Sequence, residues 1–270
     1  MNLATRPTRT SRTTLALTVV AVSVTLLAGC GGSASPPPGH SSAVRPGPAL
    51  TVFAAASLKG TFTTLGTTFE AQHPGTTVAF SFAGSSDLVT QLQQGAPVDV
   101  FASADTTNMQ KAVDDRLVAG SPVDFATNTL EIAVPPDNPA GIASFADLTR
   151  SGVKVVVCAP QVPCGAAAAK IEKATATDIK PVSEENAVTD VLGKVTSGEA
   201  DAGLVYVTDV RAAGDQVKGI PFTESGQAVN TYPIAALTSS NQSELAGQFV
   251  ALVKGSEGQQ ALAAAGFGKP

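Results

Sequence analysis

From residue 50 onward, short apolar runs alternate with stretches in which apolar residues recur every three or four positions. The runs predict buried strands at residues 50–55, 77–82, 98–102, 129–134, 153–158 and 202–207. The three-to-four-residue spacing predicts helices over 58–69, 88–92, 165–173, 188–195 and 244–265. Strands that alternate with helices predict an α/β fold with parallel sheets and helices packed on them. About 220 residues suit two lobes better than one sheet.

The first thirty residues have the pattern of an export signal. Three arginines (Arg6, Arg9 and Arg12) precede an apolar stretch over 15–27, which is shorter than the roughly 20 residues of a membrane span. The stretch ends in Leu27-Ala28-Gly29-Cys30, which resembles the bacterial lipobox, in which the cysteine is lipidated and becomes the new N-terminus. We therefore expect a signal peptide over 1–29 and a lipid on Cys30. An ordinary signal peptide with an incidental cysteine is the alternative.

Residues 30–48 are rich in proline, glycine and serine, which predicts a flexible or semi-extended tether. Two acyl chains on Cys30 are expected to hold the protein on the outer surface of the cell membrane, because a single chain binds only marginally. His40 lies in this tether, so we assign it no role.

The composition and net charge limit the classes of function that the chain can have. The chain of 270 residues is 43% hydrophobic and 14% charged, which predicts a folded core. After residue 29, 14 basic residues stand against 22 acidic ones, a net charge of −8, which argues against a nucleic-acid partner. Only His40 and His73 are histidines, and no metal-binding motif is present, so we expect no cofactor.

Cys158 and Cys164 are separated by five residues. Outside the cytoplasm the first expectation is a structural disulfide, which would fix the path of residues 159–163. A thiol–disulfide enzyme is the alternative, but no histidine flanks either cysteine.

Several small or polar residues stand where predicted strands give way to helices. Ser57 and Ser85 do so, as do Cys164-Gly165 and Ala187-Val188, and Tyr206 ends a strand. The N-terminus of a helix carries unpaired N–H groups and about half a positive charge. Four such ends that converge would match a doubly charged anion without any lysine or arginine. Each serine alone is also a common helix cap.

The amino-acid sequence of these segments resembles that of a known family, the molybdate-binding proteins of ATP-driven uptake systems, which have the type II periplasmic-binding fold. The resemblance covers residues 50–270 and rests on the ordered set Val52-Phe-Ala-Ala-Ala-Ser-Leu58, Ser81-Phe-Ala-Gly-Ser-Ser86, Gly95–Asp105, Val162-Pro-Cys-Gly165, Gly198–Tyr206 and Tyr232-Pro-Ile-Ala235. Ser103 and Asp105 belong to the third segment, and we interpret them as structural turn residues.

The resemblance implies an extracytoplasmic lipoprotein that binds molybdate or tungstate between two lobes and delivers it to the permease subunits of an ABC transporter. Two serines, backbone N–H groups at helix starts and a tyrosine hydroxyl enclose the oxyanion in that family. The matching positions here are Ser57, Ser85, Cys164, Val188 and Tyr206, with Ala187 as an alternative to Val188. Relatives often have alanine in place of Cys164.

In such a fold the chain crosses between the lobes twice. We place the crossings near Asn128–Ile132 and Asn230–Pro233, with lobe 1 formed by residues 49–129 plus 232–270 and lobe 2 by 130–231. The protein is expected to be a monomer.

Two alternative functions would use the same serines. A binding protein for another tetrahedral oxyanion such as sulfate would use the same groups, because cavity size separates these anions. A serine hydrolase using Ser57 or Ser85 needs a histidine, and only His73 lies in the predicted folded region, beside a helix-ending Pro-Gly. We therefore expect no enzymatic activity.

Overall fold

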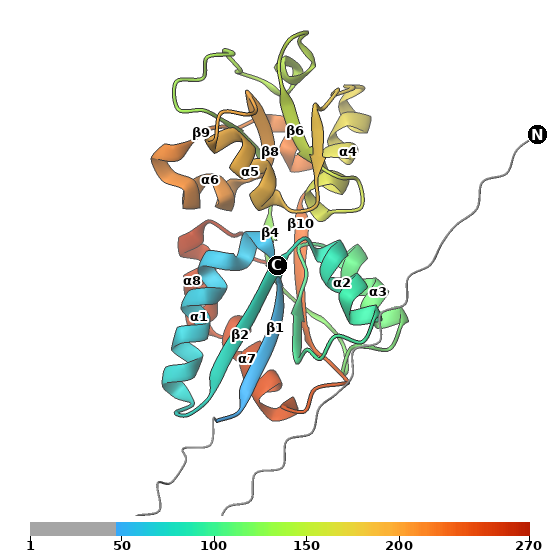
Figure 1. Cartoon of the computed structure of the whole chain (residues 1–270), viewed down its shortest axis with the longest axis vertical. Helices are drawn as coiled ribbons and strands as arrows, with labels where there is room; N and C mark the ends of the chain where they lie inside the picture. Colours follow the sequence, from blue (N-terminus) through green and yellow to red (C-terminus); the bar gives the residue numbers. More distant parts are fainter. Residues whose placement is uncertain (1–46) are drawn as a thin grey trace, which may run out of the picture. The chain divides into compact units, whose positions relative to one another are not determined.

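Two β-sheets, each covered by helices, make up the described part of the chain (Figure 1). The computed structural model describes residues 47–270. The predicted signal peptide, Cys30, His40 and most of the tether lie outside the described residues. The predicted α/β fold with two sheets is confirmed.

The first sheet has the strand order β2-β1-β3-β10-β4. Its strands are β1 (Ala49–Ala55), β2 (Thr77–Ala83), β3 (Val100–Ala102), β4 (Val123–Asn128) and β10 (Asn230–Ala236). One face packs against α1 (Lys59–Gln72), α7 (Ser243–Lys254) and α8 (Ser256–Ala265), and the other against α2 (Ser85–Gln93) and α3 (Thr106–Asp114) (Figure 1). A 3-10 turn, η1 (Ala56–Leu58), joins β1 to α1.

The second sheet has the order β7-β6-β8-β5-β9. Its strands are β5 (Leu130–Val134), β6 (Val155–Cys158), β7 (Ser183–Glu185), β8 (Ala202–Tyr206) and β9 (Lys218–Ile220). The helices α4 (Pro163–Thr175), α5 (Val188–Thr196) and α6 (Val207–Ala213) pack on it around one continuous apolar core. Short 3-10 turns complete it: η2 (Phe145–Thr149), η3 (Gly214–Gln216) and η4 (Thr223–Gln227).

The expectation of purely parallel sheets is wrong. In each sheet four strands run in one direction (β1, β2, β3 and β4 in the first; β6, β7, β8 and β9 in the second), whereas β10 runs antiparallel to its neighbours β3 and β4, and β5 runs antiparallel to its neighbours β8 and β9. The reason is the route of the chain. β5 and β10 each enter their sheet directly from the other one, so they start at the edge where the parallel strands end.

The predicted helix over 244–265 is in fact two helices. α7 ends at Lys254 and α8 begins at Ser256, with Gly255 in an extended conformation between them. The break allows Gly258 to approach the carbonyl oxygens of Leu252 and Val253, where an added Cβ would lie 2.4 Å from each. The apolar pattern alone missed this turn, because both helices present apolar residues to the same sheet face.

The chain passes from one sheet to the other where β4 ends at Asn128 and β5 begins at Leu130, and it returns between Ile220 and Asn230. The exact lobe boundaries stay a prediction. The parallel strands β1, β2, β6, β7 and β8 all end at the junction between the two sheets, where the helices that follow them begin (Figure 1).

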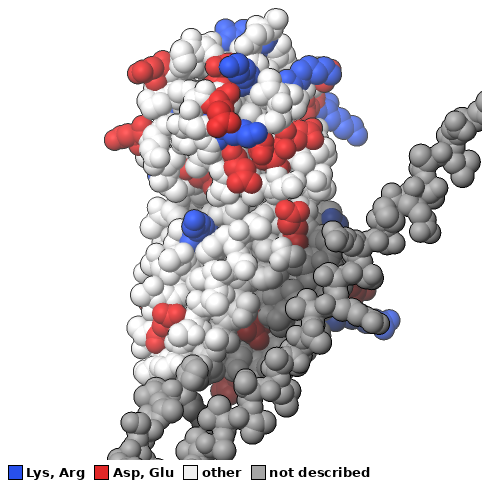
Figure 2. Space-filling view, viewed as in Figure 1, with Lys and Arg blue, Asp and Glu red and all other residues white. Residues whose placement is uncertain are grey.

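Charged side chains on the face shown in Figure 2 gather over the second sheet and its helices, while the part over the first sheet is largely uncharged. Among residues 47–270, no helix is both long and apolar enough to cross a membrane.

Candidate functional site

A small cavity lies where the ends of the parallel strands of both sheets meet. It is lined by all five residues predicted from the sequence and by seven small or apolar neighbours: Ser57, Ser85, Cys164, Val188 and Tyr206, with Ala55, Ala56, Ala83, Gly84, Ala104, Val162 and Pro163. Ala187 is not among them. The cavity volume is about 10 Å³, roughly the room that one water molecule needs. A tetrahedral oxyanion would therefore require the lining groups to move apart slightly.

Backbone N–H groups reach this cavity because three helices begin at it. Ser85 and Val188 are the first residues of α2 and α5, and Cys164 is the second residue of α4, after Pro163. Residues in the first turn of a helix have no carbonyl partner within that helix, and their N–H groups carry the positive end of its dipole. Ala187 is the N-cap of α5, so Val188 rather than Ala187 supplies the lining residue here.

Within the described part of the chain, the cavity lining contains no charged side chain. Residues 47–270 also contain no group of three histidine, cysteine or acidic residues able to hold a metal ion. The polar groups that such a lining offers a ligand are therefore backbone N–H groups at the helix starts and side-chain hydroxyl groups. Such a lining favours an anion that is fully deprotonated, because it offers N–H and O–H donors and no carboxylate to accept a proton from the anion.

The Ser85 hydroxyl has its direction set by the backbone. Ser85 is buried, and its Oγ accepts a hydrogen bond from the Ala104 N–H at 2.9 Å. Because that contact uses the oxygen as an acceptor, the hydroxyl proton is free to point into the cavity. The Ser85 hydroxyl can therefore donate into the cavity.

Tyr206 contributes a hydroxyl that no other described residue satisfies. Its side chain is 1% exposed, and its Oη has no hydrogen-bond partner among residues 47–270. Burial is the main cause that raises the pKa of Tyr206 well above its usual value, so the phenol stays neutral and keeps its proton. An unpartnered buried hydroxyl is costly for folding, and a ligand oxygen is the partner that would satisfy it.

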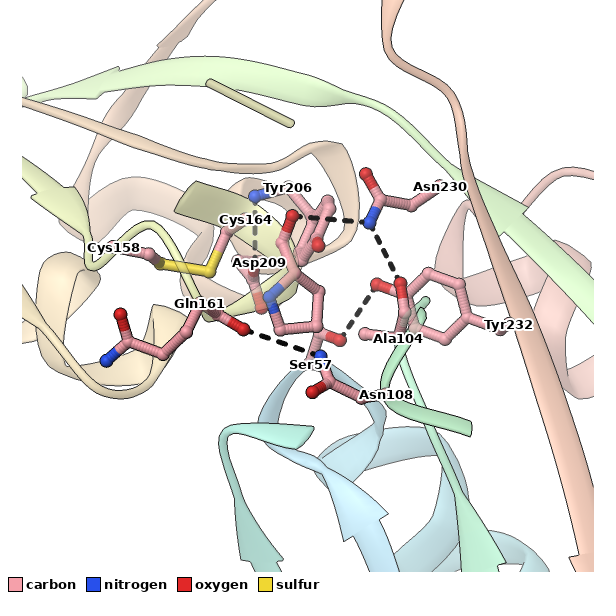
Figure 3. The surroundings of a disulfide bond; sticks show 11 residues. Ser57, Ala104, Asn108, Cys158, Gln161, Cys164, Tyr206, Asp209, Asn230 and Tyr232 are labelled. Atoms are coloured by element: carbon pink, nitrogen blue, oxygen red, sulfur yellow. Dashed lines mark hydrogen bonds between the residues drawn. A yellow bond between two sulfur atoms is a disulfide. The ribbon is translucent and has the colours of Figure 1, made fainter. Parts of the chain in front are cut away.

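Hydrogen bonds from three asparagines join the two lobes around the cavity, and Figure 3 shows those of Asn108 and Asn230. The Asn230 amide donates to the Ala104 carbonyl at 2.9 Å and to the Pro163 carbonyl at 3.4 Å. Asn108 donates to the Gln161 carbonyl at 3.5 Å, and Asn128 donates to the Thr208 hydroxyl at 2.8 Å. Sequence reasoning missed these asparagines as parts of the site. For Asn128 and Asn230 the sequence offered one indication of a place near the site, because they are the first residues of the two predicted crossings between the lobes.

The predicted disulfide between Cys158 and Cys164 is present, and Figure 3 shows it beside the site. It joins the end of β6 to the first turn of α4, so it holds the loop of residues 159–163 that provides Val162 and Pro163 to the cavity. Gly165 is required next to it, because an added Cβ would lie 2.1 Å from the Ala159 carbonyl oxygen.

Ser103 and Asp105 have the structural roles expected of them. The Asp105 carboxylate accepts a hydrogen bond from the Asn108 N–H at 2.9 Å and so caps α3, and Ser103 Oγ lies 3.3 Å from the same carboxylate. Neither residue lines the cavity.

A buried carboxyl group, Asp209, holds the backbone of Tyr206. Its Oδ2 accepts the Tyr206 N–H at 2.9 Å. Burial raises the pKa of Asp209 from 3.8 to about 7, while the Tyr206 N–H partly opposes the rise. Between these values the folded protein keeps a proton that the unfolded chain releases, so stability falls as the pH rises from about 4 to about 7.

Asp209→Asn should remove much of this pH dependence, because the amide oxygen can still accept the Tyr206 N–H but has no proton to lose. Denaturant unfolding of both proteins between pH 4 and pH 8 measures it. We expect the wild type to lose stability relative to the variant, by roughly 2–4 kcal/mol over that range. Parallel curves for the two proteins would show that Asp209 is charged at all these pH values.

Comparisons with known proteins also indicate a solute-binding protein. The family model for bacterial extracellular solute-binding proteins matches residues 50–268. The chain is 51% identical to the molybdate-binding protein ModA of Mycobacterium tuberculosis over 92% of this chain and 96% of the relative. It is 30% identical to ModA of Escherichia coli over 81% and 88%. The periplasmic molybdate-binding protein of Azotobacter vinelandii superposes with a TM-score of 0.71 and 25% identity, covering 82% of this chain and 99% of that one.

Two sheets with a donor-lined cavity at their junction define a two-lobed solute-binding protein. The chain belongs to the family of bacterial extracellular solute-binding proteins, and molybdate-binding proteins are among its relatives. The expectation that it is not an enzyme is confirmed, because this is a transport family without catalytic activity. Membership also agrees with a location outside the cytoplasm.

Proposed function

We propose that the protein captures molybdate, and tungstate with it, and delivers the anion to the permease subunits of an ABC transporter. The observation that carries this proposal is the cavity between the sheets, whose polar groups are all neutral donors and whose Tyr206 hydroxyl lacks a partner among the described residues. The 51% identity to a ModA protein over 92% of the chain supports the same ligand.

In the proposed complex the anion contacts both lobes. Ser57 and Ser85 follow strands of the first sheet, while Cys164, Val188 and Tyr206 follow or end strands of the second. An anion that accepts hydrogen bonds from both sets stabilises the closed arrangement over an open one. We propose that this closed form is what the permease recognises.

We further propose that a lipid on Cys30 holds a monomeric protein at the cell membrane, with residues 30–48 as the tether. The Leu27-Ala28-Gly29-Cys30 sequence after a basic and then apolar segment supports this. Intact mass of protein extracted from membranes tests it: an unmodified Cys30, or cleavage at another residue, would contradict the anchor.

Titration calorimetry of the purified protein against molybdate, tungstate, sulfate and phosphate tests the ligand. We expect molybdate and tungstate to bind at least about a hundredfold more tightly than the other two, a difference of about 2.7 kcal/mol. Equal affinity for sulfate would support the alternative of a more general oxyanion carrier. Failure to bind any of the four would contradict the proposal.

A further inference from the structure

Tyr232 lies directly behind one of the cavity serines. It belongs to β10, its side chain is fully buried, and its ring packs edge-to-face against Phe125, Tyr206 and Phe267. Its Oη is 3.0 Å from the Oγ of Ser57. Tyr232 itself does not line the cavity. It therefore reaches the site through its hydrogen bond to Ser57 and through the ring contact with Tyr206.

The direction of this hydrogen bond follows from Asn128. The Asn128 side-chain oxygen accepts the Thr129 backbone N–H at 3.0 Å, which fixes which end of the amide carries the NH₂ group. That NH₂ group donates to the Thr208 hydroxyl at 2.8 Å and to Tyr232 Oη at 3.4 Å. Tyr232 Oη thus accepts from Asn128, and its own proton is left for Ser57 Oγ.

Tyr232 keeps that proton at every physiological pH. Burial is the largest cause that raises the pKa of Tyr232 well above its usual range. A neutral phenol has a single proton to donate. Ser57 Oγ lies 3.0 Å from Tyr232 Oη and is within hydrogen-bonding distance, and the Tyr206 hydroxyl lies near the same Tyr232 oxygen.

We propose that Tyr232 is a positioning residue that determines specificity: it donates to Ser57 Oγ and so forces the Ser57 hydroxyl to donate into the cavity. This rests on the proposed oxyanion-binding function. Ser85 is held in the same way by the Ala104 N–H. Each serine oxygen then has one lone pair occupied by a fixed donor and its own proton directed at the guest, so the site presents donors to the ligand oxygens and disfavours an oxyanion that carries a proton. The group to be recognised is a fully deprotonated tetrahedral dianion.

Tyr232→Phe tests this, because it removes only the hydroxyl and keeps the ring packing. In the variant, Ser57 Oγ loses the donor that orients it, so its proton can turn to another partner and its oxygen can accept from the ligand. We expect molybdate affinity to fall about fivefold, which corresponds to loss of one ordering hydrogen bond. Sulfate and inorganic phosphate have the same shape but differ in the proton that phosphate keeps near neutral pH. The phosphate-to-sulfate affinity ratio should therefore rise about fivefold.

The same substitution in a Ser57→Ala background is the matched control. If Tyr232 acts through Ser57, Tyr232→Phe should change neither the affinity nor the ratio further in that background. Equal losses for all anions in both backgrounds would show a merely structural role and overturn the inference. If the wild type binds molybdate but Tyr232→Phe leaves the phosphate-to-sulfate affinity ratio unchanged, this inference is overturned and the proposed function is not. A wild type that binds no oxyanion would overturn the proposed function and this inference together.

Discussion

Replacing Tyr206 by phenylalanine is expected to weaken molybdate binding by about 10- to 100-fold while leaving the empty protein at least as stable. A hydrogen bond to a charged partner contributes about 1.5–3 kcal/mol, and this one would be lost only in the complex. In the empty protein the same hydroxyl is buried without a partner among the described residues, so its removal costs no protein contact.

The stability change has the opposite sign from that of an ordinary core substitution. Removing an unsatisfied buried hydroxyl should raise the free energy of unfolding by about 1 kcal/mol. Calorimetric titration and thermal melting of the same preparation measure both quantities. If Tyr206→Phe destabilises the empty protein and leaves the affinity intact, the hydroxyl is structural and Tyr206 is not a ligand.

Gly84→Ala is expected to lower oxyanion affinity by about tenfold or more. Gly84 is the N-cap of α2 and follows the first sheet, while Asn186 precedes α5 in the second. A Cβ on Gly84 would lie 2.0 Å from the Asn186 carbonyl oxygen, and this backbone atom can move away only if the two sheets separate. Overpacking of this kind costs about 1–3 kcal/mol, which is about 5- to 150-fold in affinity if only the closed form bears it.

Gly193→Ala in α5 provides the control. No atom lies within 4 Å of a Cβ at Gly193, so this substitution should leave affinity unchanged and stabilise the helix by about 0.5–1 kcal/mol. Gly84 has backbone angles that alanine adopts freely (φ −60°, ψ 139°), so any loss reflects the contact and not local strain. Normal affinity in Gly84→Ala would mean that the sheets do not approach this closely in the complex.

Several elements were predicted from the sequence because their residues act through local pattern. The β1 and β2 strands and the helices α1, α4 and α5 have apolar spacings that neighbouring residues alone specify. Short elements were missed for the same reason: β7 and β9 have three residues each, too few to show a period. β10, which carries Tyr232, contains a proline, which is disfavoured inside a strand, so its sequence alone does not predict this element.

Among the cavity residues, the ordered set of motifs predicted five. All five line the same cavity: Ser57, Ser85, Cys164, Val188 and Tyr206. Their role as ligands stays a prediction. The sequence motifs did not identify Asn128, Asn230 or Tyr232 as parts of the site, because the hydrogen bonds of these residues join positions more than 60 residues apart. No local spacing records which distant carbonyl or hydroxyl an amide will meet.

The amino-acid sequence predicts an α/β protein with helix starts and donor groups placed after its strands, a disulfide between Cys158 and Cys164, and a net negative charge that argues against a nucleic-acid partner. The tertiary structure alone decided how these donors are aimed. The direction of a hydroxyl proton depends on what its oxygen already accepts, and for Ser57 and Ser85 that is set by Tyr232 and by the Ala104 N–H. Such partners come together only when both sheets have formed.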